Sequence, residues 1–176
     1  MKKRECLEHL EEVTAIVPAY DTEGAVTRVF TRKYPEQKVH LTLKAVLKRL
    51  AACYGKDLSL LRQLCAKHTH MEQGSILAFS PGVVLMPWKV CRPRVPKDPA
   101  MGLLNVAWEV KLSGGDKDTL ALNLPGGEKL PVLWSKRTFT RHHALAKSMF
   151  LWVNAKEYQE LLRARGQYTD LLNGLG

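Results

Sequence analysis

The sequence has 176 residues, of which 45% are hydrophobic and 25% charged, a balance typical of a globular domain and unlike that of a disordered chain. No apolar run approaches the roughly 20 residues that cross a bilayer, so we expect a cytoplasmic protein that does not act at a membrane. The net charge of +10 and the pI of about 9.6 favour a polyanionic partner such as nucleic acid.

Short apolar runs separated by turn residues dominate the first forty positions. Residues 1–12 are an N-terminal extension that could form a short helix, although its basic start opposes the helix dipole. We expect Pro18 to end the first strand and residues 21–24 to form a turn. The predicted strands are 13–17, 25–31 and 38–41.

The pattern then changes to helical spacing. Thr42 is a suitable N-cap and Gly55 a suitable stop for a first helix, and Asp57 can cap a second. Two helices joined by a glycine turn could be a helix-turn-helix, but the second offers only Arg62 and Lys67 to DNA, so we favour a scaffolding role. The two apolar faces comprise Leu43, Val46, Leu47 and Leu50, then Leu58, Leu61, Leu64, Cys65 and His68.

The central stretch combines a strand pair with a cationic arm. Residues 76–79 and 83–87 are apolar runs on either side of a Pro-Gly turn, so we expect them to pair. Pro93 and Pro96 exclude a helix after the second strand and hold the chain extended. The cations of this arm are Lys89, Arg92, Arg94 and Lys97.

The second half of the chain predicts a meander followed by a helix. Ser135 precedes the longest helical pattern, residues 136–153, and a last helical piece begins at Tyr158 and is interrupted by Gly166. The helix residues expected to face the sheet are Phe139, His142 or His143, Ala146, Met149, Phe150 and Val153. The meander strands are 103–112, 119–124 and 129–133.

The basic residues are arranged in a way that suits DNA. Arg92 and Arg94 alternate around Pro93, so both guanidinium groups can protrude from an extended chain. A narrow A·T-rich minor groove concentrates negative potential and attracts inserted arginine, so these two residues are the leading groove contacts. The candidate phosphate contacts are Lys89, Lys97, Lys136, Arg137 and Arg141.

These elements together predict the fold class. We expect an α+β protein with a twisted antiparallel sheet of about six to eight strands and about three main helices. Residues 13–153 should form a single DNA-binding domain, and residues 154–176 a C-terminal helical extension or tail.

Two other functions stay open. An RNA-binding or ribosome-associated protein would stack single-stranded bases on aromatic side chains, for which Trp88, Tyr54 and Trp134 are the candidates. A small enzyme would need a cryptic histidine site, with His68 and His70 on one strand face.

The motif content argues against the enzyme. The chain has no GxGxxG, phosphate-loop, HExxH or GxSxG motif. Its four cysteines form no CxxC pair, and His142-His143 is the only other histidine pair available to a site. We therefore expect no catalysis, no metal and no cofactor.

The order of motifs resembles the competence transcription factor ComK family. The similarity covers residues 13–152, and neither the first dozen residues nor the tail after Val153 aligns with the family. It is based on the hydrophobic pattern, the turn positions and a few identities. The segments that carry it are Ala15-Ile16-Val17-Pro18, Cys53-Tyr54-Gly55, Ile76–Phe79 with Val83–Pro87, Leu104-Asn105-Val106, and Gly127-Glu128-Lys129-Leu130-Pro131-Val132 running into the helix after Ser135.

The resemblance implies a sequence-specific DNA-binding transcription activator. Such a protein binds paired A·T-rich boxes through the minor groove, as homodimers that associate further on double-stranded DNA. RNA polymerase would then be an indirect partner, recruited or stabilised at the promoter.

Overall fold

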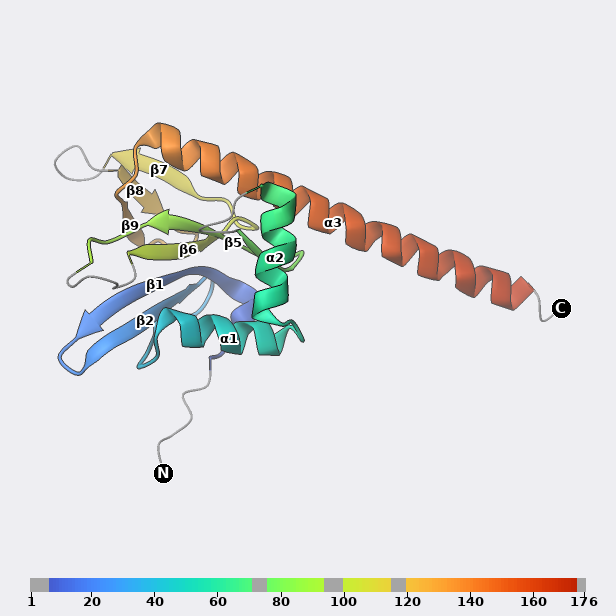
Figure 1. Cartoon of the computed structure of the whole chain (residues 1–176), viewed down its shortest axis with the longest axis horizontal. Helices are drawn as coiled ribbons and strands as arrows, with labels where there is room; N and C mark the ends of the chain where they lie inside the picture. Colours follow the sequence, from blue (N-terminus) through green and yellow to red (C-terminus); the bar gives the residue numbers. More distant parts are fainter. Residues whose placement is uncertain (1–6, 71–75, 94–99, 115–119, 174–176) are drawn as a thin grey trace, which may run out of the picture.

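The computed structural model describes residues 7–70, 76–93, 100–114 and 120–173, which form two antiparallel sheets and three α-helices (Figure 1). The expected α+β class, a twisted antiparallel sheet with three main helices, is confirmed. The helices are α1 (Leu43–Cys53), α2 (Leu58–Thr69) and α3 (Lys136–Asn173). In the larger sheet the strand order is β3 (Gln37–Val39), β2 (Gly24–Thr31), β1 (Val13–Asp21), β6 (Met101–Asn105), β5 (Val83–Lys89) and β4 (Leu77–Ser80). In the smaller sheet it is β7 (Lys111–Gly114), β8 (Leu120–Asn123) and β9 (Lys129–Val132).

The β1–β2 hairpin differs from prediction at Pro18, where β1 continues instead of ending. β2 pairs with β1 along its whole length, but β6 pairs only with Ala15 and Ile16. Pro18 therefore lies where β1 has a neighbouring strand on one side only, a position in which the missing N–H of proline costs no ladder bond. β3 ends at Val39, two residues earlier than expected, since Leu41 and Thr42 leave the sheet to begin α1.

The expected N-terminal helix is wrong for the described residues of that segment, because only Leu10–Glu12 are helical, as a single 3-10 turn. The chain before this turn is held by side-chain contacts with β3 and with Tyr34, which precedes that strand. Gln37 exchanges two hydrogen bonds with the backbone of Glu8, at 3.1 and 2.9 Å. The His9 ring stacks on Tyr34 with 3.5 Å between centroids. Residues 1–6 lie outside the described part of the chain.

The two predicted N-caps are confirmed. Thr42 Oγ1 accepts a hydrogen bond from Ala45 N at 3.3 Å, and Asp57 Oδ1 accepts one from Leu60 N at 2.8 Å. The apolar face of α1 is buried as expected, whereas α2 buries only Leu61, Cys65 and Thr69. Leu64 and His68, assigned to the same face of α2, are exposed.

The long strand predicted over 103–112 is wrong, because the chain turns after Asn105. The Asn105 side chain is fully buried and makes four hydrogen bonds with backbone groups. Its Oδ1 accepts from Val84 N and Ala107 N, both at 3.1 Å. Its Nδ2 donates to Val13 O at 2.8 Å and to Gly82 O at 2.9 Å. The Asn105 side-chain amide thus takes the place of the backbone hydrogen bonds that a longer β6 would have made. The strands β7–β9 form a separate sheet.

A fully buried tryptophan joins the two sheets. Trp88 Nε1 donates to Pro131 O at 3.1 Å, and nearby Leu133 N donates to Lys89 O at 2.8 Å. The Trp88 ring is packed so closely on Gly102 that a Cβ added there would lie 2.9 Å from it. The ends of β5 and β9 are therefore fixed side by side.

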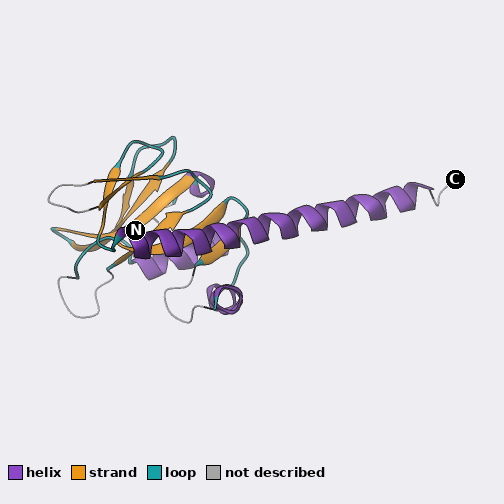
Figure 2. Ribbon diagram, turned by 90° about the horizontal axis from the view of Figure 1, so that it is seen from above, coloured by secondary structure: helices purple, strands orange, loops and turns teal. Residues whose placement is uncertain are grey.

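The helix α3 covers this sheet pair and then extends far beyond it (Figures 1 and 2). Phe139, Ala146 and Met149 are buried against the strands, as predicted. The predicted interruption at Gly166 is wrong, because α3 continues through this residue to Asn173. Among the described residues, no helix has the length and apolar character needed to cross a lipid bilayer.

Candidate nucleic-acid interface

The predicted cations of the central arm lie where β5, β9 and α3 meet. Lys89 is the last residue of β5, and the chain after it bends away, held by Val90 N and Cys91 N, which donate to Ala100 O at 3.0 and 3.3 Å. Arg92 and Pro93 follow in irregular, exposed conformation. Arg94 and Lys97, two further predicted contacts, lie outside the described residues.

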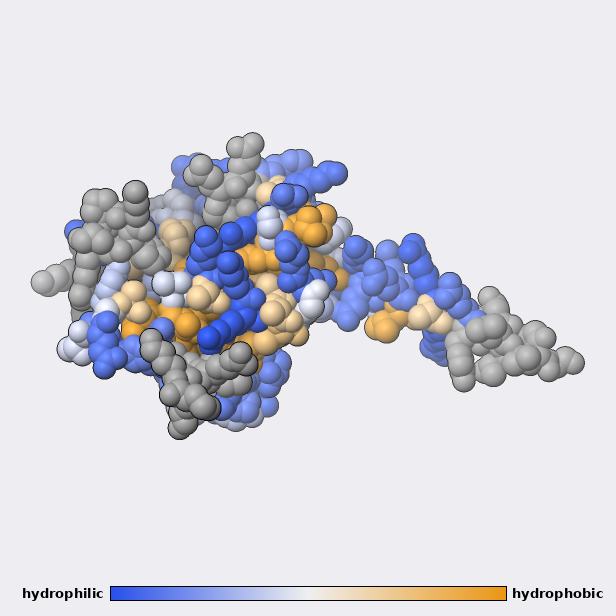
Figure 3. All heavy atoms as spheres, turned by 60° about the horizontal axis from the view of Figure 1, so that its bottom comes forward, coloured by the Kyte–Doolittle hydropathy of each residue, from blue (hydrophilic) through white to orange (hydrophobic). Residues whose placement is uncertain are grey.

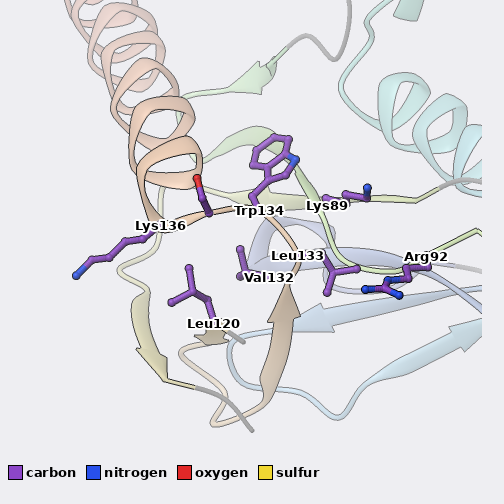
Figure 4. Close-up of a pocket in the computed structure, with 8 residues that line it drawn as sticks. Lys89, Arg92, Leu120, Val132, Leu133, Trp134 and Lys136 are labelled. Atoms are coloured by element: carbon purple, nitrogen blue, oxygen red, sulfur yellow. The ribbon is translucent and has the colours of Figure 1, made fainter. Parts of the chain in front are cut away.

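A cavity of about 520 Å³ opens at this junction (Figure 4). Its floor is apolar, and Arg92 and Lys136 lie on opposite sides of Val132 and Leu133. Lys89 is half-buried, while Arg92 and Lys136 are exposed. The lining residues are Lys89, Arg92, Leu120, Val132, Leu133, Trp134, Ser135 and Lys136. Three of the seven predicted contacts are thus brought together from two parts of the sequence that are more than forty residues apart.

The start of α3 adds positive potential to the cavity. Ser135 Oγ caps the helix by accepting a hydrogen bond from Thr138 N at 3.2 Å. The first turn contains Lys136 and Arg137 and no acidic residue, so the charges add to the positive end of the helix dipole. Arg141 is exposed one turn later. Arg137 and Arg141 are not part of the cavity wall but share its end of α3.

Ion pairing is concentrated in a different part of the molecule. Seven ion pairs of the described residues join side chains within residues 9–40. There Arg32 Nε lies 2.9 Å from Glu12 Oε2, and its hydrogen bond lowers the pKa of Glu12. The five described cations at the junction have no carboxylate partner within the described residues.

One aromatic side chain belongs to the cavity. Trp134 lines it and its ring lies against His142, with 4.5 Å between centroids. Burial lowers the pKa of the His142 imidazole, and the neighbouring Arg141 lowers it further, which favours the neutral imidazole. Trp88 is fully buried and Tyr54 packs on Phe79 at 6.1 Å, so neither can stack on a base at this cavity.

The strand face on which the alternative enzyme hypothesis would place His68 and His70 does not exist. His68 lies in α2 and its ring contacts Trp152 at 4.4 Å, while His70 follows the end of α2 in left-handed conformation. Within the described residues, no three His, Cys, Asp or Glu side chains are grouped so as to hold a metal ion.

A larger cavity, of about 760 Å³, was not anticipated from the sequence. It lies between α2, β4 and α3 and has an apolar floor that includes Leu61, Phe79 and Met149. The exposed Leu64 and Trp152 stand at its edge. The only sequence signal for it was the excess of leucine in α2 over what one buried face requires.

Comparison with models of known protein families, with curated proteins and with solved structures found no match for this chain.

Proposed function

We propose that this protein is a DNA-binding transcription activator that contacts duplex DNA with the junction of β5, β9 and α3. The observation that carries the proposal is the meeting of Lys89, Arg92 and Lys136 around one cavity, with no carboxylate partner among the described residues. Cations gathered at one place on the surface favour phosphate binding, because neutralising phosphates releases condensed counterions.

The elements suggest a division of roles at the DNA. Lys89 and Lys136, with Arg137 and Arg141, are placed to hold successive phosphates along one strand edge and the start of α3. Arg92 leaves the sheet on the irregular chain and is the proposed minor-groove contact, together with Arg94. Recognition would then depend on groove width and deformability, which favours A·T-rich sites. The resemblance to competence transcription factors points to the same partner, to RNA polymerase as the indirect one, and to the cytoplasm.

Binding of single-stranded nucleic acid is the second candidate. Trp134 at the cavity wall beside three cations could stack on an unpaired base. This candidate differs from the first in its preferred probe and in its dependence on Trp134.

Fluorescence anisotropy with three labelled probes tests the proposal. An A·T-rich duplex, a G·C-rich duplex and a single-stranded RNA are each titrated at two salt concentrations. We expect the A·T-rich duplex to bind at least about 100-fold more tightly than the other two, within the usual range for specific complexes. Equal, steeply salt-dependent binding to all three probes would overturn the proposed recognition of A·T-rich sites. Tighter binding to the RNA would favour the second candidate, the binding of single-stranded nucleic acid.

A further inference from the structure

The larger cavity, between α2, β4 and α3, is separate from the proposed DNA-binding junction and has the size of a ligand site. Its volume of about 760 Å³ lies within the roughly 300–1,000 Å³ that is usual for sites of small molecules. In Figure 3 apolar side chains gather on the surface of the domain next to the point where the long helix leaves it. No described residue lines both this cavity and the smaller one.

The floor of the larger cavity is apolar and is made by three elements. Leu61 of α2, Phe79 of β4 and Met149 of α3 are all buried and line it. The Cys65 thiol is part of the same lining, and burial raises the pKa of this thiol, which favours its uncharged form. Such a floor suits the alkyl part of a ligand, because burying alkyl groups away from water is favourable.

Contacts between the walls hold this cavity in shape. Cys65 Sγ accepts a hydrogen bond from Ala78 N at 3.5 Å, which joins α2 to β4. Asn154 Nδ2 donates to Pro81 O at 3.4 Å, which joins α3 to the turn after β4. Preformed walls lower the entropy cost of binding a ligand.

Positive side chains gather around one indole ring at the edge of the floor. Trp152 of α3 is 46% exposed, and its ring lies 4.4 Å from the His68 ring, measured between centroids. Lys156 Nζ lies 5.6 Å from the centre of the same indole ring. Lys67, the neighbour of His68 in α2, is exposed and also lines the cavity. Two ammonium groups and an aromatic surface are thus placed beside the apolar floor.

The charge of the rim suits a ligand with a single negative charge. Lys56, Lys67 and Lys156 line the cavity together with Glu157 and Glu160, which leaves a net charge of +1. A polyanion would meet the two carboxylates as well as the lysines, and like charges at short range repel. A single carboxylate at the edge formed by Lys67 and Lys156 can form charge-assisted hydrogen bonds with two ammonium groups.

We propose that the larger cavity binds a fatty acid, with its alkyl chain on the floor formed by Leu61, Phe79 and Met149. Its carboxylate lies between Lys67 and Lys156. The alkyl chain supplies most of the affinity by leaving water, and the two lysines fix the orientation of the ligand. This inference goes beyond DNA binding and does not depend on it.

Isothermal titration calorimetry of the full chain without DNA tests the proposal. Octanoate, decanoate and dodecanoate are titrated below the concentrations at which they form micelles. We expect one molecule per chain, with a dissociation constant for decanoate between about 1 and 100 µM. Each added methylene should tighten binding about 2- to 4-fold, because it buries more apolar surface. Absence of saturable binding, or an affinity that does not change with chain length, would overturn the proposal.

Decanol tests the position of the carboxylate, because it has the same alkyl chain and no charge. We expect decanol to bind at least about 5-fold more weakly than decanoate. Lys67→Glu with Lys156→Glu should weaken decanoate at least about 10-fold and change decanol less than about 3-fold. The matched control is Lys44→Glu with Lys48→Glu on the exposed face of α1, which should change decanoate less than about 3-fold. Equal losses of decanoate affinity in the two double variants would overturn the assigned carboxylate site.

Tryptophan fluorescence locates the ligand, because a bromine atom on the alkyl chain quenches an indole that it contacts. Brominated decanoate should quench the wild-type chain, and Trp152→Phe should remove most of this quenching. The control Trp134→Phe, in the smaller cavity, should leave it unchanged. The opposite result would place the ligand at the smaller cavity and overturn the proposal.

A leucine-rich amphipathic helical peptide provides the last comparison. If this peptide binds the chain and the acids do not, the occupant of the larger cavity is a protein segment and the proposal is wrong. Since no DNA is present in these titrations, absent fatty-acid binding with intact DNA binding would reject this inference alone.

Discussion

Asn105→Ala is expected to lower the free energy of unfolding by about 2–4 kcal/mol, because it removes four hydrogen bonds to the backbone, two of them fully buried. Val84 N and Ala107 N lose their acceptor and Gly82 O loses a donor, while Val13 O loses one of two and keeps the hydrogen bond from Trp108 Nε1 at 2.9 Å. These groups belong to three separate segments, so no local shift can satisfy them all. Urea denaturation followed by circular dichroism measures the change.

The matched control is Asn123→Ala in the smaller sheet. Asn123 Nδ2 donates to Lys111 O at 3.0 Å and to Ser113 Oγ at 2.9 Å, but the bond to Lys111 is solvent-exposed. Water can replace the lost partners, so we expect a loss of about 1 kcal/mol. A similar loss for both variants would contradict the assignment of Asn105 as the junction of three segments.

Trp88→Ala is expected to cost about 3–5 kcal/mol and also to weaken DNA binding. The indole is fully buried, so truncation leaves a large cavity between the sheets. It also removes the hydrogen bond to Pro131 O, which joins the end of β5 to β9. Since Lys89 lies on one of these strands and Lys136 follows the other, their relative positions would become less defined.

Trp134→Ala provides the comparison for this variant. Trp134 is half-buried at the cavity wall, so its loss should cost clearly less stability. Thermal and urea unfolding measure the stability of the two variants, and duplex binding is measured well below the unfolding temperature. The comparison separates a loss of packing in the fold from a loss of direct contact with DNA. If Trp88→Ala left both stability and duplex binding unchanged, the proposed role of the indole in fixing the junction would be wrong.

Local signals in the sequence were sufficient for α1, α2 and two of the hairpins. Thr42 and Asp57 were identified as N-caps because capping depends on residues three positions apart. The β1–β2 and β4–β5 turns were found for the same reason, since their residues are consecutive. Errors arose mainly where a distant partner decides the outcome.

Three positions illustrate the errors, and the first two depend on distant partners. The end of β6 depends on hydrogen bonds from Asn105 to segments up to 92 residues away. The continuation of β1 through Pro18 depends on where β6 stops pairing. Gly166 was expected to break α3 because of its intrinsic propensity, a weak preference that the flanking helix overrides.

The candidate site was predicted in part. The charge pattern identified Lys89, Arg92 and Lys136, but as an extended arm and a separate helix. Their convergence requires β9 to lie beside the end of β5, a tertiary contact made through Leu133 and Trp88. The apolar floor has no signature of its own in the sequence, and Trp134 was singled out only as a candidate for stacking on single-stranded bases.

The central claim is that this junction, and not the basic charge in general, binds DNA. The most direct measurement compares two triple variants by anisotropy on the A·T-rich duplex across a salt series. Lys89→Ala, Arg92→Ala and Lys136→Ala together remove three charges from the junction. The control removes the same charge from exposed positions of α1 and α2, with Lys44→Ala, Lys48→Ala and Arg62→Ala.

We predict that the junction variant binds at least about 30-fold more weakly, with a salt slope lower by about three. The control should lose less than about 3-fold. Equal losses of affinity and slope in the two variants would contradict the claim.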